Sequence, residues 1–247
     1  MPNFEKEKSI RIKNFKKNKS LLKVANKFTK ESLYPLYSYN FNWLGRPIIQ
    51  YPQDIIALQE IIWNVRPDLI IETGIARGGS LIFSSSMLSL LDTFQSKKAN
   101  RKVIGIDIDI RIHNKKALEK HPFSKNIKMI EGSSIDSKVL DKVKKIAKNF
   151  KKILVFLDSN HTHEHVYEEL NLYTPFVSKN SYCVVFDTIV EDLPKNYIKN
   201  RPWNKGNNPK TAIKKFLKIN KNFKIDNDYN NKLLISMNPD GYLKKFK

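Results

Sequence analysis

One short segment limits the fold of this chain more than any other, an apolar run that ends in a carboxylate and a glycine-bearing loop. Residues 69–71 have no polar face, which is typical of a strand buried on both sides of a parallel sheet. Glu72 ends the run, three glycines follow within residues 74–79, and Ser80 opens an apolar stretch of helical length. A strand, a glycine loop and a helix start form the nucleotide site of doubly wound α/β folds.

The glycine spacing indicates which ligand this loop could hold. A dinucleotide fingerprint requires G-x-G-x-x-G, which this loop does not match. Glu72 would repel a pyrophosphate at the helix N-terminus, but it could bind an amino group. The loop resembles motif I of S-adenosylmethionine-dependent methyltransferases, whose cofactor carries an ammonium group and no phosphate. A strand-to-helix turn without any cofactor is the alternative.

The length of 247 residues predicts one main α/β domain. No stretch approaches the roughly 20 apolar residues of a membrane helix, and the N-terminus has no apolar signal-peptide core, so we expect a cytoplasmic protein. The single cysteine, Cys183, lies in an apolar run. It excludes a disulfide framework and indicates a buried, inert thiol.

The net charge of +21 raises the question of a nucleic-acid or RNA-modifying function, which we keep as an alternative. Lysine is spread through almost every segment, which indicates a solvated surface, and we expect no nucleic-acid partner. The exception is residues 5–30, where ten basic residues meet two acidic ones. This arm could lie on an anionic membrane near a lipid-linked substrate, fray, or serve as an oligomer contact.

The chain divides into two parts by composition. Residues 1–42 are a basic N-terminal arm followed by an aromatic, turn-rich segment, and residues 43–247 carry the predicted α/β domain. The minimal fold does not need the first part. We therefore expect self-association through part of it, and thus a homo-oligomer.

A second buried strand is predicted over residues 103–107, and it again ends in a carboxylate. Asp107 holds the position from which dinucleotide enzymes and methyltransferases grip ribose hydroxyls. Asp109 competes for this role or caps a helix over residues 110–120. Two acidic strand ends in succession favour a nucleotide-type cofactor.

A third strand over residues 127–131 is followed by Ser133 and Ser134. Small hydroxylated residues there could approach an adenine edge. They could equally cap the next helix, predicted over residues 139–150.

The fourth and fifth strands, residues 153–157 and 182–186, end at Asp158 and Asp187. Parallel neighbours lie about 4.8 Å apart, so the two carboxylates can share one cation. Two oxygen ligands with room for water and substrate suit a magnesium-like ion, which can polarise a hydroxyl for deprotonation.

Three of the five histidines, at positions 161, 163 and 165, fall at the end of the fourth strand. We interpret His161 as a general base. His163 or Thr162 could cap the following helix and His165 could lie on its surface, and a solvated turn is the alternative for the whole cluster. Residues 223–225 and 233–237 are predicted to be a closing pair of strands.

These segments together resemble the cephalosporin hydroxylase and rhamnosyl O-methyltransferase family over roughly residues 43–243. The matching pieces are Glu72-Thr-Gly with Arg77-Gly-Gly-Ser, Gly105-Ile-Asp-Ile-Asp, Gly132-Ser-Ser, Asp158-Ser-Asn-His-Thr-His, Asp187-Thr and Pro202-Trp-Asn-Lys-Gly-Asn-Asn-Pro. The resemblance implies a Rossmann-like doubly wound sheet of about seven strands, the last antiparallel, with helices on both faces. It also implies an S-adenosylmethionine site in the loop after the first strand and Mg²⁺ at the ends of strands four and five.

Phe186 is a departure from this resemblance, since metal-dependent relatives carry two adjacent acidic residues after strand five. Water, Glu191 or Asp192 could supply the missing ligand, or the site could be weaker. The family name also includes hydroxylation, which needs a redox centre such as iron with two histidines and a carboxylate; no such pattern is evident. Methyl transfer is therefore favoured, and an oxygenase component is the alternative.

The sequence thus predicts an S-adenosylmethionine-dependent O-methyltransferase acting on a hydroxyl of a sugar, glycolipid or related natural product. The predicted catalytic residues are His161 and Asp158, and the predicted metal ligands are Asp158 and Asp187. The predicted cofactor-binding residues are Glu72, Thr73, Gly74, Arg77, Gly78, Ser80, Asp107, Ser133, Ser134 and Asp158.

Overall fold

The computed structural model describes residues 2–96, 99–195 and 197–247, and its centre is a seven-stranded sheet. The strand order is β5-β4-β3-β6-β7-β9-β8. All strands are parallel except β9, which pairs antiparallel with β7 and β8. The strands are β3 (Leu69–Thr73), β4 (Lys102–Asp107), β5 (Ile127–Glu131), β6 (Ile153–Leu157), β7 (Tyr182–Val185), β8 (Phe223–Ile225) and β9 (Tyr242–Lys245). The predicted fold class, including the reversed last strand, is confirmed.

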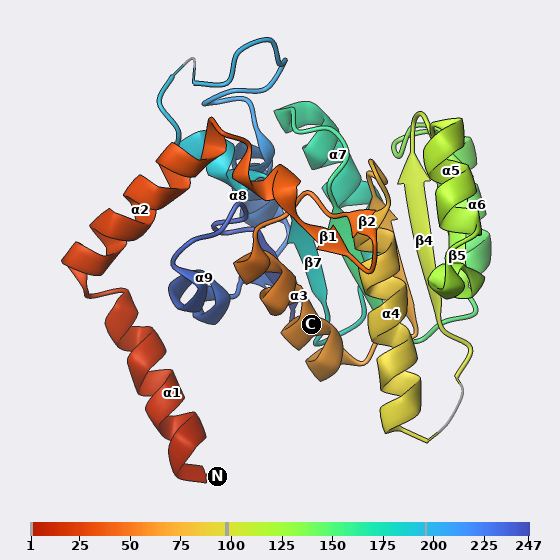
Figure 1. The fold of residues 1–247 in the computed structure, drawn as a ribbon, viewed down its shortest axis with the longest axis horizontal. Coiled ribbons are helices and arrows are strands. Elements are labelled where there is room, and N and C mark those ends of the chain that lie inside the picture. Colours follow the sequence, from red (N-terminus) through yellow and green to blue (C-terminus); the bar gives the residue numbers. More distant parts are fainter. Residues whose placement is uncertain (1, 97–98, 196) are drawn as a thin grey trace.

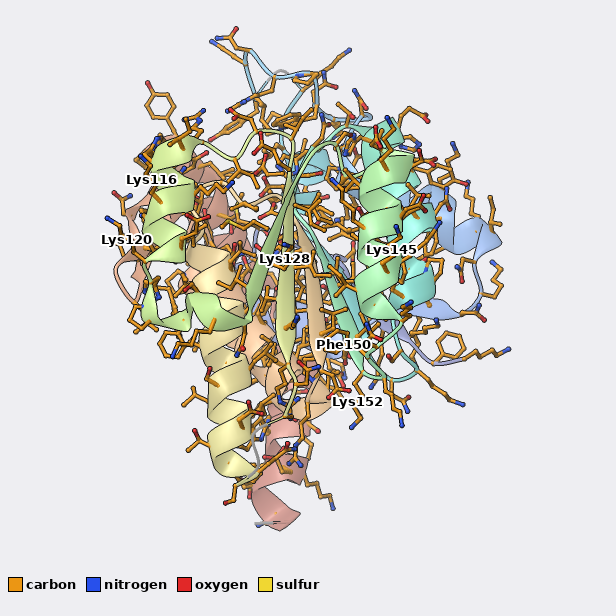
Figure 2. The ribbon with its side chains drawn as sticks, turned by 90° about the vertical axis from the view of Figure 1, so that its right-hand side faces the viewer. Lys116, Lys120, Lys128, Lys145, Phe150 and Lys152 are labelled. Carbon is orange, nitrogen blue, oxygen red and sulfur yellow. The ribbon has the colours of Figure 1, made fainter. Side chains whose placement is uncertain are left out.

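Helices cover both faces of the sheet because alternate strand residues point to opposite sides. Ile70 packs into a core with helices that include α3 (Pro52–Val65), α4 (Gly79–Phe94), α5 (Ile112–Glu119) and α9 (Asn227–Leu233). Its neighbour Ile71 packs into a second core with α6 (Ser137–Ala147), α7 (His163–Tyr173) and α8 (Pro209–Ile219). Figure 2 shows the sheet from the side of β5, which carries Lys128, with α5 on one side and α6 on the other.

The N-terminal arm is helical. It consists of α1 (Pro2–Phe15) and α2 (Lys19–Leu33), and Figure 1 shows α1 extending away from the sheet. A 3₁₀ turn, η1 (Tyr37–Asn40), and a hairpin of β1 (Asn42–Trp43) and β2 (Arg46–Pro47) lead into the domain. The hairpin packs on α4, where Trp43 Nε1 donates to Ser86 Oγ at 3.0 Å. In the described ranges, no helix is long and apolar enough to cross a membrane.

One predicted strand is absent, and two capping alternatives are excluded. Residues 233–237 do not form a strand: Leu233 ends α9, Leu234 adopts a positive φ of 58°, and the Met237 amide donates to Asp54 instead of to a neighbouring strand. The closing strand is β9. Asp109 does not cap a helix, because α5 begins at Ile112 after Arg111.

The serines after β5 do not cap α6 either. Its N-cap is Asp136, whose side chain accepts from the Lys138 amide. The predicted buried state of Cys183 is confirmed, and burial raises the pKa of its thiol. The remaining short elements are η2 (Pro122–Asn126), η3 (Thr174–Phe176) and η4 (Thr188–Asp192).

Candidate functional site

The candidate site lies where the chain reverses its direction of strand addition. From β3 the chain adds β4 and β5 on one side, and then β6 and β7 on the other, so β3 and β6 are neighbours at the centre. Open α/β sheets bind ligands in the crevice at the carboxyl ends of such strands. The loop after β3 and the segment after β6 meet at this point.

Gly74 brings these two segments into direct contact. It adopts a φ of +89°, and a Cβ built on it would overlap the carbonyl group of Asp158. The close approach is therefore between two backbones, rather than between the loop and a ligand alone. Gly78 also has a packing role, because a Cβ there would overlap the Leu118 side chain.

Glu72 is buried at the end of β3, with 2% of its surface exposed. Its Oε1 accepts from the Ser80 hydroxyl, while Oε2 has no hydrogen-bond partner in the described chain. Burial raises the pKa of Glu72 to about 8, against the lowering effect of the Ser80 hydrogen bond. The adjacent Thr73 hydroxyl is also buried without a partner. An unpaired buried carboxylate oxygen is costly, and an ammonium group would satisfy it.

Asp107 holds the loop after β3 in shape. Its Oδ2 accepts from the backbone amides of Ile75 and Ala76 at 2.8 and 3.2 Å, and its Oδ1 accepts from the Asp109 amide. Oδ2 thus accepts two hydrogen bonds and Oδ1 only one, which leaves an acceptor site on Oδ1, so a contact with a ribose hydroxyl stays a prediction. Arg77 is exposed on the same loop, and its carbonyl accepts from the Arg46 guanidinium.

Ser134, the second serine after β5, takes part in a network that sequence alone did not indicate. Ser134 Oγ lies 3.0 Å from His165 Nε2, which is also 3.2 Å from Ser159 Oγ. Ser159 in turn donates to the fully buried Glu169 at 2.7 Å. The sequence placed His165 on the helix surface. In the structure its side chain instead lies inside this network. Ser133 meets α6 through its carbonyl, which accepts from Asp136.

Asp158, His161 and Asp187 converge after β6 and β7. One ligand atom from each lies within 4.8 Å of the others, and His161 Nε2 is 3.2 Å from Asp187 Oδ2. The His161 ring packs edge-on against Trp203. Burial raises the pKa of Asp158 well above its ordinary value, and the negative charge of Asp187 raises it further. Two carboxylates and an imidazole are a donor set that fits a divalent cation, which would relieve this repulsion.

The acidic residues after Asp187 do not join this group. Glu191 accepts from the Gly206 amide and from Asn208, and Asp192 accepts from Lys210. Phe186 is buried and packs edge-on against Phe156. The third donor near Asp158 and Asp187 is therefore His161, not one of the two acidic residues considered from the sequence.

His163 has a different environment from His161. Its backbone amide donates to Asn207 Oδ1 at 2.8 Å, and its Nδ1 lies 2.7 Å from Thr211 Oγ1. Thr211 completes a capping box with Asn208 at the start of α8. His163 thus joins α7 to α8. The N-cap of α7 is Thr162, without a side-chain capping bond.

A cavity of about 580 Å³ opens beside the three converging residues. Ala76 from the loop after β3 lines it, as do Gln50, Asp54 and Asn238. Its aromatic lining comes from segments far apart in the sequence, namely Tyr34, Tyr39, Phe186, Tyr197 and Trp203. Sequence reasoning missed Gln50, Asp54 and Asn238. The only available signal was that Asp54 stands near the start of an amphipathic helix, which indicated a helix-dipole role.

The sheet order, the reversed last strand and the acidic strand ends define the methyltransferase class of doubly wound folds. Within this class, the chain belongs to the rhamnosyl O-methyltransferase/CmcI family, whose model matches residues 35–246. It is therefore a member of an S-adenosylmethionine-dependent O-methyltransferase family, as predicted.

Two curated relatives are named rhamnosyl O-methyltransferase. The protein from Mycobacterium leprae is 28% identical over 171 residues, which cover 66% of this chain and 69% of the relative. The protein from Mycobacterium bovis is 29% identical over 144 residues, and the match covers 57% of this chain but only 54% of that relative.

Three solved structures share the fold at low sequence identity. A CmcI structure described with SAH has a TM-score of 0.57 and 17% identity, covering 84% of this chain and 83% of that one. An O-methyltransferase from Bacillus cereus in complex with SAH has a TM-score of 0.52 and 11% identity, covering 93% and 92%. A further CmcI structure, with a TM-score of 0.56 and 17% identity, is described with Mg and SAM and covers 85% of this chain and 78% of that one.

Proposed function

We propose that this protein transfers the methyl group of S-adenosylmethionine to a hydroxyl of a sugar, glycolipid or related glycoside, with the help of a divalent cation such as Mg²⁺. The observation that carries the proposal is the convergence of Asp158, His161 and Asp187 on one cavity beside the loop after β3. The family and the names of its curated relatives support a sugar acceptor.

The cofactor end of the site is assigned to the segment from Glu72 to Ser80. The unpartnered Glu72 Oε2 and Thr73 hydroxyl offer acceptors for the ammonium group of the cofactor. Asp107 shapes the loop and stands at the next strand end, where ribose hydroxyls bind in such folds. The CmcI structure described with Mg and SAM supports this cofactor.

The acceptor end of the site is assigned to the cavity. Aromatic faces such as Tyr34, Tyr39 and Tyr197 offer apolar walls against which the C–H faces of a sugar ring can pack. Tyr34 is 91% exposed, so a bound acceptor would cover apolar surface that water now contacts.

The proposed chemistry divides the work between His161 and the two carboxylates. Asp158 and Asp187 would hold the cation, which supplies orientation of the acceptor and stabilises its developing negative charge. In this proposal the cation is held by the two carboxylates and not by His161, whose imidazole takes the proton of the acceptor hydroxyl. The oxygen then forms a bond to the methyl carbon as the carbon–sulfur bond breaks, which leaves S-adenosylhomocysteine.

The donor set favours methyl transfer over the oxygenase alternative. Non-haem iron oxygenases use two histidines and one carboxylate, whereas the group found in the described residues has one histidine and two carboxylates. Within the described ranges, no feature of the site favours the nucleic-acid alternative.

The test combines binding with activity. Calorimetry should show S-adenosylmethionine binding to the wild type, and Mg²⁺ or Mn²⁺ binding that Asp187→Asn weakens more than tenfold. Methylation of methyl α-L-rhamnopyranoside should be lost in chelator. Asp141→Asn, which removes a carboxylate from an exposed surface pair, is the matched control. Full activity of the wild type in chelator and of His161→Ala would refute the proposed site.

A further inference from the structure

Two buried amide side chains line the cavity and each leaves one polar atom without a partner. Gln50 Oε1 and Asn238 Nδ2 are buried and have no hydrogen-bond partner in the described chain. Buried polar atoms are nearly always paired, because an unmade hydrogen bond loses the hydration of the group. Two such atoms on side chains that line the same cavity therefore indicate the place of a polar ligand group.

The orientation of the Asn238 amide is fixed by the candidate metal site. Its Oδ1 accepts from the backbone amide of Asp187 at 3.0 Å, so the free atom is the nitrogen, which is a donor. Asn238 has no exposed surface. The amide group that carries the free donor is therefore the same one that contacts the Asp187 backbone.

Gln50 offers a hydrogen-bond acceptor where Asn238 offers a donor. It is 6% exposed, and its free atom is Oε1, which is an acceptor. It stands directly before Tyr51, which is fully buried with its hydroxyl 2.7 Å from Ser32 Oγ. The backbone that carries Gln50 is thus anchored by the side chain next to it.

Asp54 connects the two amides. This buried carboxylate on α3 accepts from Ser236 Oγ at 2.6 Å, from the Met237 amide at 2.9 Å and from Tyr242 at 2.8 Å. It therefore ties the segment that carries Asn238 to the helix that Gln50 precedes. Both amides are held before any ligand binds, which lowers the ordering cost of binding.

We propose that Gln50 and Asn238 form a hydroxyl-binding subsite that recognises a second free hydroxyl of the saccharide acceptor, besides the one that is methylated. A hydroxyl both donates and accepts, so it can satisfy an amide oxygen and an amide nitrogen, alone or with a neighbouring hydroxyl. The inference rests on the proposed function, because the position of the reacting hydroxyl beside Asp187 is taken from it.

The test measures saccharide binding by saturation-transfer NMR, without cofactor, using methyl α-L-rhamnopyranoside and its 2-, 3- and 4-deoxy analogues. Gln50→Met keeps the length of the side chain and removes its polar atoms. It should weaken binding of the parent glycoside by about 3- to 10-fold, the effect of one hydrogen bond. One of the three deoxy analogues lacks the hydroxyl that Gln50 contacts. That analogue should bind to the wild type and to Gln50→Met with the same affinity, as a double-mutant cycle requires.

Gln53→Met is the matched control. Gln53 also has a buried Oε1 without a partner and lies on the first turn of α3, but it is not among the cavity-lining residues. It should leave saccharide binding unchanged. Asn238→Asp is the second variant: it keeps an oxygen for the Asp187 amide, replaces the free donor by an acceptor, and should weaken binding as Gln50→Met does.

The outcomes separate this inference from the proposed function. Equal effects of the two glutamine variants, or unchanged discrimination against every deoxy analogue in folded Gln50→Met, would overturn the subsite even if the wild type methylates the glycoside. Binding that depends on Gln50, in an enzyme that does not methylate the glycoside with S-adenosylmethionine and Mg²⁺, would overturn the reaction and retain the subsite. No saccharide binding by the wild type would overturn both.

Discussion

Asp187 depends on an unusual backbone conformation. It directly follows Phe186 after β7 and adopts a positive φ of 53°, a region that aspartate tolerates better than most residues. Its amide donates to Asn238 Oδ1. The carboxylate therefore turns toward Asp158 and His161 because a residue 51 positions later in the chain fixes its backbone.

We expect His161→Ala to lower the methylation rate by about 10² to 10⁴, the usual contribution of a general base. The affinity for S-adenosylmethionine should stay near that of the wild type, because His161 lies at the acceptor end of the site. The loss should be smaller for acceptors with more acidic hydroxyls. Rates from single-turnover assays check this, with His113→Ala, which removes an exposed histidine, as the control. A weaker cofactor affinity with an unchanged rate would contradict the assignment.

Glu72 should make the stability of the cofactor-free protein depend on pH. Burial raises its pKa from an ordinary 4.5 to about 8, so between these values the folded chain keeps a proton that the unfolded chain has lost. Stability should therefore fall as pH rises from about 5 to about 8, by up to roughly 5 kcal/mol.

The variant Glu72→Gln cannot ionise and should lack this part of the pH dependence. Urea unfolding of both proteins at pH 5 and pH 8 measures the difference. Equal slopes in wild type and variant would show that Glu72 is not protonated in the folded state. Added S-adenosylmethionine should reduce the wild-type slope if its ammonium group meets this carboxylate.

Some site residues could be found from sequence because strand ends leave a local pattern. Asp158 and Asp187 each follow a continuous apolar run, and the parallel sheet brings such ends together. Gln50 and Asn238 leave no such pattern, because Asn238 is placed by its tertiary contact with Asp187 and Gln50 by its position on the cavity. The predicted position of His165 was wrong for the same reason, because its partner Ser134 follows a different strand.

At the scale of elements, the strands were predicted well where they are buried on both sides. Residues 153–157 and 69–71 have no polar face, and both lie in central strands. The apolar character of residues 233–237 predicted a strand that does not form. Ser236 and Met237 donate hydrogen bonds to Asp54, so this segment does not pair with a strand of the sheet. A buried carboxylate nearly two hundred residues earlier is not a local signal.

The junction of β3 and β6 gives a test at this scale. Gly74→Ala should destabilise the fold by about 3 kcal/mol or more, because the added methyl meets the Asp158 backbone in addition to the positive φ. Gly45→Ala is the matched control, since Gly45 has a similar φ of +81° and nothing within 4 Å of its Cβ position. It should cost only about 1 kcal/mol.

Urea unfolding of the two glycine variants measures these losses. If both lose the same stability, the contact between the loop and Asp158 does not hold the strand ends together. A loss of S-adenosylmethionine binding in a Gly74→Ala protein of wild-type stability would instead assign Gly74 to the ligand alone.

At the scale of the whole molecule, the N-terminal arm exposes apolar side chains that the domain does not cover. Phe4 and Ile10 on α1 and Val24 on α2 are each at least half exposed. Self-association would remove them from water. We expect light scattering to give a mass of at least twice the 28.9 kDa of one chain.

The variant Phe4→Lys/Ile10→Lys should shift the protein toward the monomer, because it places charges on the apolar surface of α1. Leu90→Lys, on an exposed face of α4, is the control. A wild-type protein that stays monomeric at every concentration would contradict the predicted oligomer. Binding of the monomer to anionic vesicles, weakened by salt, would assign the arm to a membrane surface instead.

The sheet order also bears on how the protein is made on the ribosome. β8 pairs only with β9 in this sheet, and β9 lies between β7 and β8. Until the segment that carries Asn238 and β9 has emerged from the ribosome, β8 has no partner in this sheet and the Asp187 backbone lacks the contact with Asn238. A nascent chain that stalls before Asn238 would already contain Asp158 and His161 on a nearly complete sheet, but it would lack the backbone contact that turns the third residue toward them. The site therefore becomes complete only after the segment that carries Asn238 has emerged.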